Sequence, residues 1–471
     1  MKREFKLVNN SDLKSREKVI QDKEVFLNDD PIFDPRTRPS LDAAINMIIG
    51  EQGGFRIPVA AVPLAHHTNI PEQNLFRCLF GRDALLIADL LRNRRPELRL
   101  NVISALASVQ GVKMDSLSEE EPGRIAHEVR SADDLRGQEL VATAKWKFPY
   151  YGAVDATLIW LRILGELASE DEAKLDLEIA GTPLWRHAMS ATSWILKRLE
   201  TPSGLIESNR MNPAGITNQV WKDSGDSYMH SDGTLARGDS TASIETVGEC
   251  YDALIAACAI QRLRPSELWP ASESLLIAKA ENVRRLLIDL MWLGDRFALG
   301  TERDVMGEQH PLDSQASNQG RLLDSHILMG EEFKTYCDAI ATAVSGSALL
   351  GETGLRTLSA EHISYRPGGY HTGSAWPMDG VFVARGLARH GYLAEAKLLG
   401  VRTKQSIESF GGYPEFFRGD GPEHGLITTR VIDVMSENGD TKDRSNRICQ
   451  PPQIIQGWTV GAYAWLTEFL S

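Results

Sequence analysis

Apolar residues recur along most of the chain at the spacing of an α-helix. In the segment 154–169 (VDATLIWLRILGELAS), Val154, Leu158, Leu161 and Leu164 fall on one face, as expected for a helix that buries one side. The same period predicts helices at 184–199, at 242–263 (where "GDST" just before it offers N-cap residues), at 40–50, 83–94, 98–110, 271–292, 331–345, 376–391, 392–409 and 457–470, with one more near 133–147.

Long polar segments separate these helices, and alternating strand patterns bounded by hairpin turns are scarce. The segments 111–132, 201–240, 296–326, 359–375 and 410–456 are rich in Gly, Pro, Asp and aromatic residues. Loops of this length are uncommon unless they are functional. We therefore expect an all-α fold, a closed toroid of paired helices whose loops carry the working surface. Residues 1–38 read as an N-terminal arm and 39–471 as one catalytic domain.

The composition excludes several classes of partner. The 471 residues are 42% hydrophobic and 24% charged, with a net charge of −13, which argues against nucleic acid as a partner because a phosphate backbone demands clustered Lys and Arg. No apolar run has the length of a signal peptide core or of a membrane span, so no membrane partner is expected. The five cysteines show no CxxC spacing, which favours a reduced, cytoplasmic protein.

The motifs of metal, phosphate and serine chemistry are missing. The chain has no HExxH, and "AHH" at 65–67 lacks a carboxylate at helical spacing, so we expect no metal and no cofactor. Calcium bound by "DSGDSYMHSDG" (223–233) is a minor alternative, since that loop lacks the terminal bidentate Glu of an EF-hand. There is no GxxxxGK[ST] and no GxSxG elbow, which disfavours nucleotide binding and serine nucleophiles.

Aromatic residues and carboxylates gather in the polar loops. An aromatic ring can stack on the apolar face of a pyranose while charged side chains take its hydroxyls. Hydrolysis of a glycosidic bond needs two carboxyls, one protonated and one ionised. An oligosaccharide or small glycoside is therefore the expected substrate. The alternative is that these aromatic residues only pack the rim of the core.

Several strings resemble motifs of one family. They are "LFGRDALLIADLL" (79–91), "EEPGRIAHEVR" (120–130), "FPYYGAVDAT" (148–157), "NQVWKDSGDS" (218–227), "ASNQGRLL" (316–323), "YHTGSAWPMDGVFVARGLARHGY" (370–392) and "GYPEFFRG" (412–419). In this order they resemble bacterial amylo-α-1,6-glucosidases, the relatives of the C-terminal domain of glycogen debranching enzyme. The resemblance implies an (α/α)6 toroid, the six-hairpin glycosidase fold, and an inverting hydrolase acting from the chain end on α-linked glucosyl residues.

The resemblance also assigns roles to two carboxyls. It implies Asp226, the last residue of "KDSGD", as the general acid, and Glu415 in "YPEFF" as the general base. Inversion places such carboxyls roughly 6.5–9.5 Å apart. Asp223 is expected to tune Asp226 or to orient Lys222 or a sugar hydroxyl. The alternative for Glu415 is a salt bridge to Arg418.

The remaining candidates are expected to bind the sugar. Arg82 and Asp83 resemble the pair that holds the hydroxyls of the terminal glucose, although Asp83 also suits the N-cap of a helix starting at residue 84. Asp232, followed by Gly233, is typical of a turn. Further residues are expected to line the site; the alternative is that they only support the residues that contact the sugar. They are Tyr150, Tyr151, Asp155, Trp221, Lys222, Asp223, His371, Trp376, Asp379 and Trp458.

Other functions remain open on the sequence alone. The family motif often reads WKDSWD, and Gly225 stands here in place of the second Trp. The missing indole should widen or reshape the sugar site, which argues against α-1,6 debranching of large glucans. A catalytically silent carbohydrate-binding protein, a hydrolase of another small glycoside, and a lyase or phosphorylase on the same fold are the alternatives.

Overall fold

The computed structural model describes residues 34–62, 75–237, 240–428 and 452–471, and within them the predicted helices are confirmed. Several begin as their sequences predict: Ser272 caps α9 through a hydrogen bond from Leu275 N, and Pro377 opens α11. The α-helices are α2 (Leu41–Met47), α3 (Gly81–Leu90), α4 (Glu97–Ala107), α5 (Leu135–Ala144), α6 (Asp155–Glu170), α7 (Leu184–Arg198), α8 (Ile244–Leu263), α9 (Glu273–Met291), α10 (Lys334–Ser345), α11 (Pro377–Arg389), α12 (Leu393–Glu408) and α13 (Gly457–Phe469).

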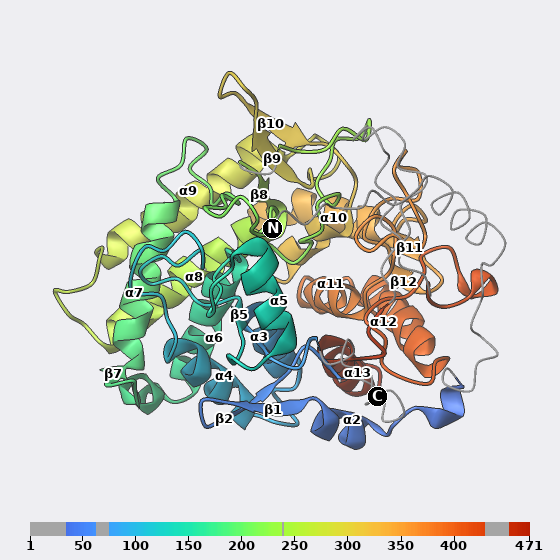
Figure 1. Ribbon diagram of the computed structural model, residues 1–471. Coiled ribbons are helices and arrows are strands. Elements are labelled where there is room, and N and C mark those ends of the chain that lie inside the picture. Colours follow the sequence, from blue (N-terminus) through green and yellow to red (C-terminus); the bar gives the residue numbers. More distant parts are fainter. Residues whose placement is uncertain (1–33, 63–74, 238–239, 429–451) are drawn as a thin grey trace, which may run out of the picture.

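Six buried segments pack against one another and form the middle of the molecule (Figure 1). These central segments are α3, α6, α8, the 3-10 helix η7 (Ser317–Leu323), α11 and α13. Each contacts the next, and α13 packs back on α3. The helices α4, α7, α9, α10 and α12 each pack on the central segment that precedes them in the chain, and α2 packs on α13. This order of contacts is consistent with the predicted toroid of helical hairpins.

The strands in the described residues are short, two to four residues each, and none forms a large sheet. Several directly precede a helix, and β9 with β10 forms a hairpin at the top of Figure 1 in which β9 also pairs with β8. The antiparallel pairs are β1 (Ile49–Gln52) with β2 (Phe55–Pro58), β3 (Ala61–Val62) with β13 (Ile455–Gln456), β4 (Leu79–Phe80) with β5 (Glu128–Val129), β6 (Glu178–Ile179) with β7 (Thr182–Pro183), β8 (Ala242–Ser243) and β10 (Gln309–Leu312) with β9 (Gly300–Arg303), and β11 (Leu350–Gly351) with β12 (Gly354–Leu355).

Two details differ from the sequence prediction. The segment 296–326, expected to be a loop, contains the β9–β10 hairpin and η7; a seven-residue 3-10 helix has a period near three and is too short for the α-helical pattern to reveal. "GDST" does not cap α8, because the helix begins at Ile244 with Ser243 as its N-cap. The other 3-10 helices are η3 (Pro35–Thr37), η6 (Glu172–Asp176), η8 (Glu331–Phe333) and η9 (Pro422–His424).

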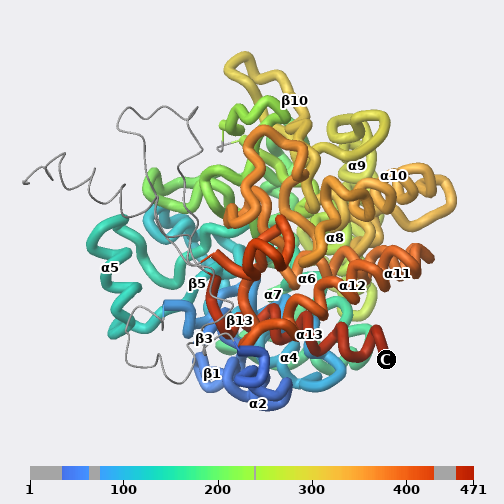
Figure 2. Tube along the Cα trace, turned by 90° about the vertical axis from the view of Figure 1, so that its right-hand side faces the viewer, coloured from blue at the N-terminus to red at the C-terminus, as the bar shows by residue number. Residues whose placement is uncertain are grey.

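Most of the core is one large hydrophobic cluster that runs through all the central segments. At the start of α3, a Cβ on Gly81 would lie 2.1 Å from the carbonyl oxygen of Ala126, so only glycine allows this close approach. The predicted arm falls mostly on residues 1–33, outside the described residues. Figure 2 shows α13 near α2 at the lower edge of the molecule, and the two helices are in contact. Within the described ranges, no helix is both long and apolar enough to cross a membrane.

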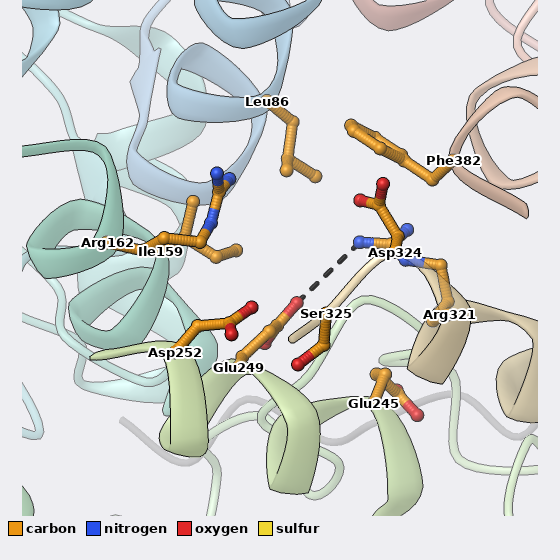
Figure 3. A pocket seen from close by; sticks show the side chains of 10 residues that line it. All are labelled: Leu86, Ile159, Arg162, Glu245, Glu249, Asp252, Arg321, Asp324, Ser325 and Phe382. Carbon is orange, nitrogen blue, oxygen red and sulfur yellow. Dashed lines mark ion pairs between the residues drawn. The ribbon is translucent and has the colours of Figure 1, made fainter. Parts of the chain in front are cut away.

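A small polar cavity of about 30 Å³ lies between the central segments (Figure 3). Glu249 of α8 points into it and approaches Arg321 of η7, Oε1 to Nη2, at 3.6 Å. Burial, the largest cause, raises the pKa of Glu249 well above its ordinary value. Close by, Arg385 of α11 binds Asp324 and the fully buried Asp89 at 2.7 and 2.9 Å. Paired charges therefore occupy part of the interior.

Candidate active site

Three polar side chains of the site lie in the first turns of central segments. Arg82, in the first turn of α3, and Asp155, the first residue of α6, form a buried salt bridge of 2.6 Å between Nε and Oδ2. Asp83 follows Arg82 in the same turn. It is not the N-cap of a helix starting at residue 84, because α3 begins at Gly81 and Phe80 occupies the cap.

Asp223 reaches this pair from the loop before α8. Its Oδ2 lies 4.0 Å from Nη1 of Arg82, and 37% of its side chain remains accessible. Burial raises the pKa of Asp223 to about 6, and the charge of Arg82 opposes the shift. Burial also raises the pKa of Asp83 to about 7, and repulsion from Asp223 contributes. The two carboxyls therefore interact and titrate near neutral pH.

Glu415 is held from two sides. Its Oε1 accepts a hydrogen bond from the hydroxyl of Tyr370 at 2.7 Å, and its Oε2 accepts one from the backbone N–H of Gln453 at 3.1 Å. Burial raises the pKa of Glu415 to about 7, with repulsion from Asp83 and Asp223 adding to it, while the two hydrogen bonds lower it. Arg418, the sequence alternative as a partner, pairs with Asp420 at 2.6 Å.

Asp226 lies three residues beyond Asp223 and is half-buried. Its Oδ1 accepts a hydrogen bond from Ser224 Oγ at 2.9 Å, and the same hydroxyl lies 2.9 Å from Nδ1 of His371. Asp232 accepts a hydrogen bond from Thr234 N next to Gly233, whose φ is +86°. The prediction of a turn at Asp232 is therefore confirmed.

Lys222 points away from Asp223, toward η7. Its ammonium contacts Asn318 Oδ1, the carbonyl oxygen of Thr357 at 2.7 Å and Ser317 Oγ at 3.3 Å. The residue is 1% exposed. These three acceptors match the three donors of an ammonium. The prediction that Asp223 orients Lys222 is therefore wrong.

Aromatic rings pack behind the carboxyls. Trp376, the N-cap residue of α11, stacks on His371 and on Phe416 with ring centroids 5.1 and 5.3 Å apart, and it meets Trp458 edge-on at 5.5 Å. Trp221 meets His371 edge-on at 5.5 Å. Burial, together with the charges of Lys222 and Arg82, lowers the pKa of His371 well below its ordinary value, so this imidazole is neutral at pH 7.

Several of the predicted residues end in buried polar atoms without a hydrogen-bond partner among the described residues. Such atoms are rare in native proteins, and a ligand rich in hydroxyls can satisfy them. They are Asp155 Oδ1, Trp221 Nε1, His371 Nε2, both carboxyl oxygens of Asp379, and Trp458 Nε1.

Two predicted residues do not join the carboxyls. The hydroxyl of Tyr150 accepts a hydrogen bond from Ile216 N, its ring stacks on Trp146, and the hydroxyl of Tyr151 donates to Val109 O. Both rings are buried and both hydroxyls are used within the protein. This matches the alternative that they support their neighbours.

Three functional candidates were missed by sequence reasoning. Tyr370 holds Glu415, while Asn318 joins Lys222 to Glu245 at the start of α8. Tyr370 and Asn318 stand inside motifs that carry the family resemblance, and this is the signal that could have found them. Glu245 carries no such signal, because an acidic residue in a first helical turn is common. As for metals, the described ranges contain no group of three or more His, Cys, Asp or Glu side chains able to hold an ion.

Comparisons with known proteins give a fold and no closer relationship. No family model matches the sequence, and no curated protein matches it. Among solved structures, the GH63 mannosylglycerate hydrolase from Thermus thermophilus, bound to Tris and D-glycerate, is similar with a TM-score of 0.59 and 13% identity, covering 92% of this chain and 100% of that chain. A glycosidase in complex with glucose is similar with a TM-score of 0.52 and 13% identity, covering 92% of this chain and 97% of that one. At such low identity the likeness establishes the fold alone: this chain has the fold of these glycosidases.

Proposed function

We propose that the protein is a glycoside hydrolase. The observation that carries this proposal is the placement of two carboxyls from separate loops in one site: Asp223 lies 4.0 Å from Arg82, and Glu415, bonded to Tyr370, is close enough to Asp223 for the two to repel each other. Burial raises the pKa values of the two carboxyls to about 6 and about 7, so the interacting pair holds about one proton near neutral pH, as acid–base hydrolysis of a glycoside requires. The shared fold with glycosidases and the buried unpartnered polar atoms of the site support the same function.

Asp223 is the proposed general acid and Glu415 the proposed general base. Asp223 gives its proton to the glycosidic oxygen as the bond to the anomeric carbon breaks. Glu415 takes a proton from a water molecule, whose oxygen attacks that carbon from the opposite face, so the configuration inverts. Hydrogen bonds from Tyr370 and Gln453 to both oxygens of Glu415 favour its ionised form. Arg82 and Asp83 hold hydroxyls of the sugar.

The choice of Asp223 differs from the sequence prediction of Asp226 as the acid. Asp223 lies beside Arg82 and repels both Asp83 and Glu415. Asp226 is bonded to Ser224 within its own loop. The second experiment below tests this choice between the two carboxyls.

The finer assignment follows the sequence motifs. We propose that the hairpins complete an (α/α)6 toroid and that the enzyme acts from the chain end on α-linked glucosyl residues. The second candidate is hydrolysis of another small glycoside, which is favoured by the likeness to a mannosylglycerate hydrolase over the whole length of that chain.

The first test offers the protein a panel of α-linked glucosides and mannosides and follows the released sugar by NMR. Release of the β-anomer from an α-glycoside supports inversion, whereas release of the α-anomer contradicts it. Binding of these sugars without any turnover would instead support the catalytically silent carbohydrate-binding protein.

The second test compares Asp223→Asn with Asp226→Asn. Each variant is assayed on an alkyl glycoside and on the fluoride of the same sugar, because fluoride departs with little help from an acid. Loss of the general acid is expected to slow hydrolysis of the alkyl glycoside by about 10²–10⁴-fold. Hydrolysis of the fluoride should be slowed far less. The variant with this pattern identifies the acid, and Asp232→Asn in the turn serves as the matched control.

A further inference from the structure

The mechanism above leaves one buried cation unused. Lys222 stands between Trp221 and Asp223, yet its ammonium is directed into the protein, to Asn318, Thr357 and Ser317. A buried ammonium is costly unless its donors are paired, and here three acceptors surround it. The side chain therefore ties the loop that carries Asp223 to η7.

Asn318 extends this tie to a second central segment. Its Oδ1 accepts from Lys222, and its Nδ2 donates to Glu245 Oε2 at 2.9 Å. The other oxygen of Glu245 accepts from the hydroxyl of Tyr228 at 2.9 Å. All four residues are at most 3% exposed. A fully satisfied buried polar network of this kind is rigid, so it fixes the loop relative to both α8 and η7.

The loop also contacts His371 through Ser224 Oγ, at 2.9 Å from Nδ1, and two further hydrogen bonds join residues of the loop to each other. Asn218 Nδ2 donates to the carbonyl oxygen of Ser224 at 2.8 Å, and Ser227 Oγ donates to the carbonyl oxygen of Lys222 at 2.5 Å. These bonds set the shape of the turn, whereas the side chain of Lys222 sets its position against the helices. Because Asp223 is the next residue, its carboxyl moves with Lys222.

We propose that Lys222, held by Asn318, is a positioning residue for the general acid Asp223 and is not a ligand of the sugar. This inference rests on the proposed function. The lysine of "WKDSGD" is thus bound by the asparagine of "ASNQG".

The state of Lys222 is consistent with this role. Burial lowers the pKa of Lys222 to about 8, while Asp379 and Glu245 raise it. The side chain is therefore charged at pH 7 and loses its charge as the pH rises through about 8. A neutral amine binds the same acceptors more weakly, so Lys222 should hold the loop less firmly above about pH 8.

A residue that positions the acid affects only reactions in which the leaving group needs a proton. A ligand of the sugar affects all substrates alike, through binding. The test therefore compares Lys222→Met with the wild-type protein on an alkyl glycoside and on the fluoride of the same sugar, and it measures the affinity for the free sugar. The same substitution at Lys334, an exposed residue paired with Asp338 on α10, is the matched control.

For Lys222→Met we expect kcat on the alkyl glycoside to fall by about 10²-fold, the low end of what a general acid contributes. We expect the fluoride rate and the affinity for the free sugar to stay within about 3-fold of wild type, on the same principle. Asn318→Ala, which cuts the tie from its other end and leaves the loop sequence intact, should show the same split if the lysine variant does not fold. Thermal unfolding reports whether each variant is folded.

Two results would overturn the inference. An equal loss on the alkyl glycoside and the fluoride, or a weakened affinity for the sugar, would make Lys222 a sugar ligand or a purely structural residue while leaving the hydrolase intact. A wild-type protein inert toward every glycoside and every fluoride would refute the proposed function itself, and the positioning role with it.

Discussion

The hydroxyl of Tyr370 donates a hydrogen bond to Oε1 of Glu415 at 2.7 Å. Tyr370 lies in the loop before α11, and Glu415 lies 45 residues later, before α13. The bond thus joins two loops that serve different central segments. It stabilises the ionised carboxyl, which is the form that a general base must have.

Replacing Tyr370 with Phe removes this bond without removing the ring. The pKa of Glu415 should rise, because the bond from Tyr370 lowers it. The acidic limb of kcat/KM against pH should then move to higher pH, with about a 10-fold loss of rate near pH 6. Tyr392→Phe, which removes a hydroxyl bonded to Asp338 between α10 and α12, should leave the limb in place. An unmoved limb in Tyr370→Phe would show that Glu415 is not the base.

Glu415 should also make stability depend on pH. Its pKa is raised to about 7 in the folded protein from 4.5, so the folded state binds the proton more tightly than the unfolded state. The stabilisation is fully present below pH 4.5 and is lost as the pH rises through about 7. In urea titrations at pH 8, the free energy of unfolding of Glu415→Gln should therefore exceed that of wild type by on the order of 2 kcal/mol. Near pH 4 the two proteins should be equally stable.

The control for this measurement is Glu273→Gln on the exposed start of α9. The hydrogen bond from Arg262, the largest cause, lowers the pKa of Glu273, so this substitution should give no gain at pH 8. A gain of the same size in both variants would mean that net charge, and not the buried carboxyl, controls the pH dependence.

Arg385 should be essential for stability. Its guanidinium binds Asp324 and the fully buried Asp89. Arg385→Met leaves these carboxylates without their main partner, and we expect the free energy of unfolding to fall by about 3–5 kcal/mol in urea titrations. Arg285→Met, which breaks an exposed pair with Asp289 on α9, should cost less than about 1 kcal/mol. Equal costs would contradict the difference between buried and exposed pairs.

Gly225 should accept a large side chain. A Cβ at this position meets no atom within 4 Å, so Gly225→Trp should fold normally and keep its free energy of unfolding within about 0.5 kcal/mol of wild type. Restoring the indole of the WKDSWD motif should lower KM for longer α-glucosides, measured against KM for the shortest. Gly81→Ala is the opposite control and should be strongly destabilised, because its Cβ would collide with Ala126 O. If the ratio of KM for the longer α-glucosides to KM for the shortest does not change, Gly225 does not determine substrate choice.

Much of the helical architecture could be predicted from the residues alone. The α-helical period of buried positions is a local property, so the segments at 154–169 and 376–391 matched α6 and α11 closely. The α-helical period did not predict η7, a 3-10 helix of seven residues that is one of the central segments. The motifs also located Arg82, Asp155 and Glu415 without showing what each contacts.

Sequence by itself determined which segments are α-helices and which loops hold carboxyls and aromatic residues, because the hydrophobic period and the motifs are local properties of the chain. Tertiary structure alone decided that Lys222 faces Asn318, that Asp223 faces Arg82, and that Tyr150 and Tyr151 use their hydroxyls within the protein. These contacts join residues 66 to 141 positions apart in the chain, apart from Tyr151 and Val109 at 42. The direction of a side chain and the pKa of a carboxyl depend on which of its distant neighbours exclude water from it, and no local pattern encodes that.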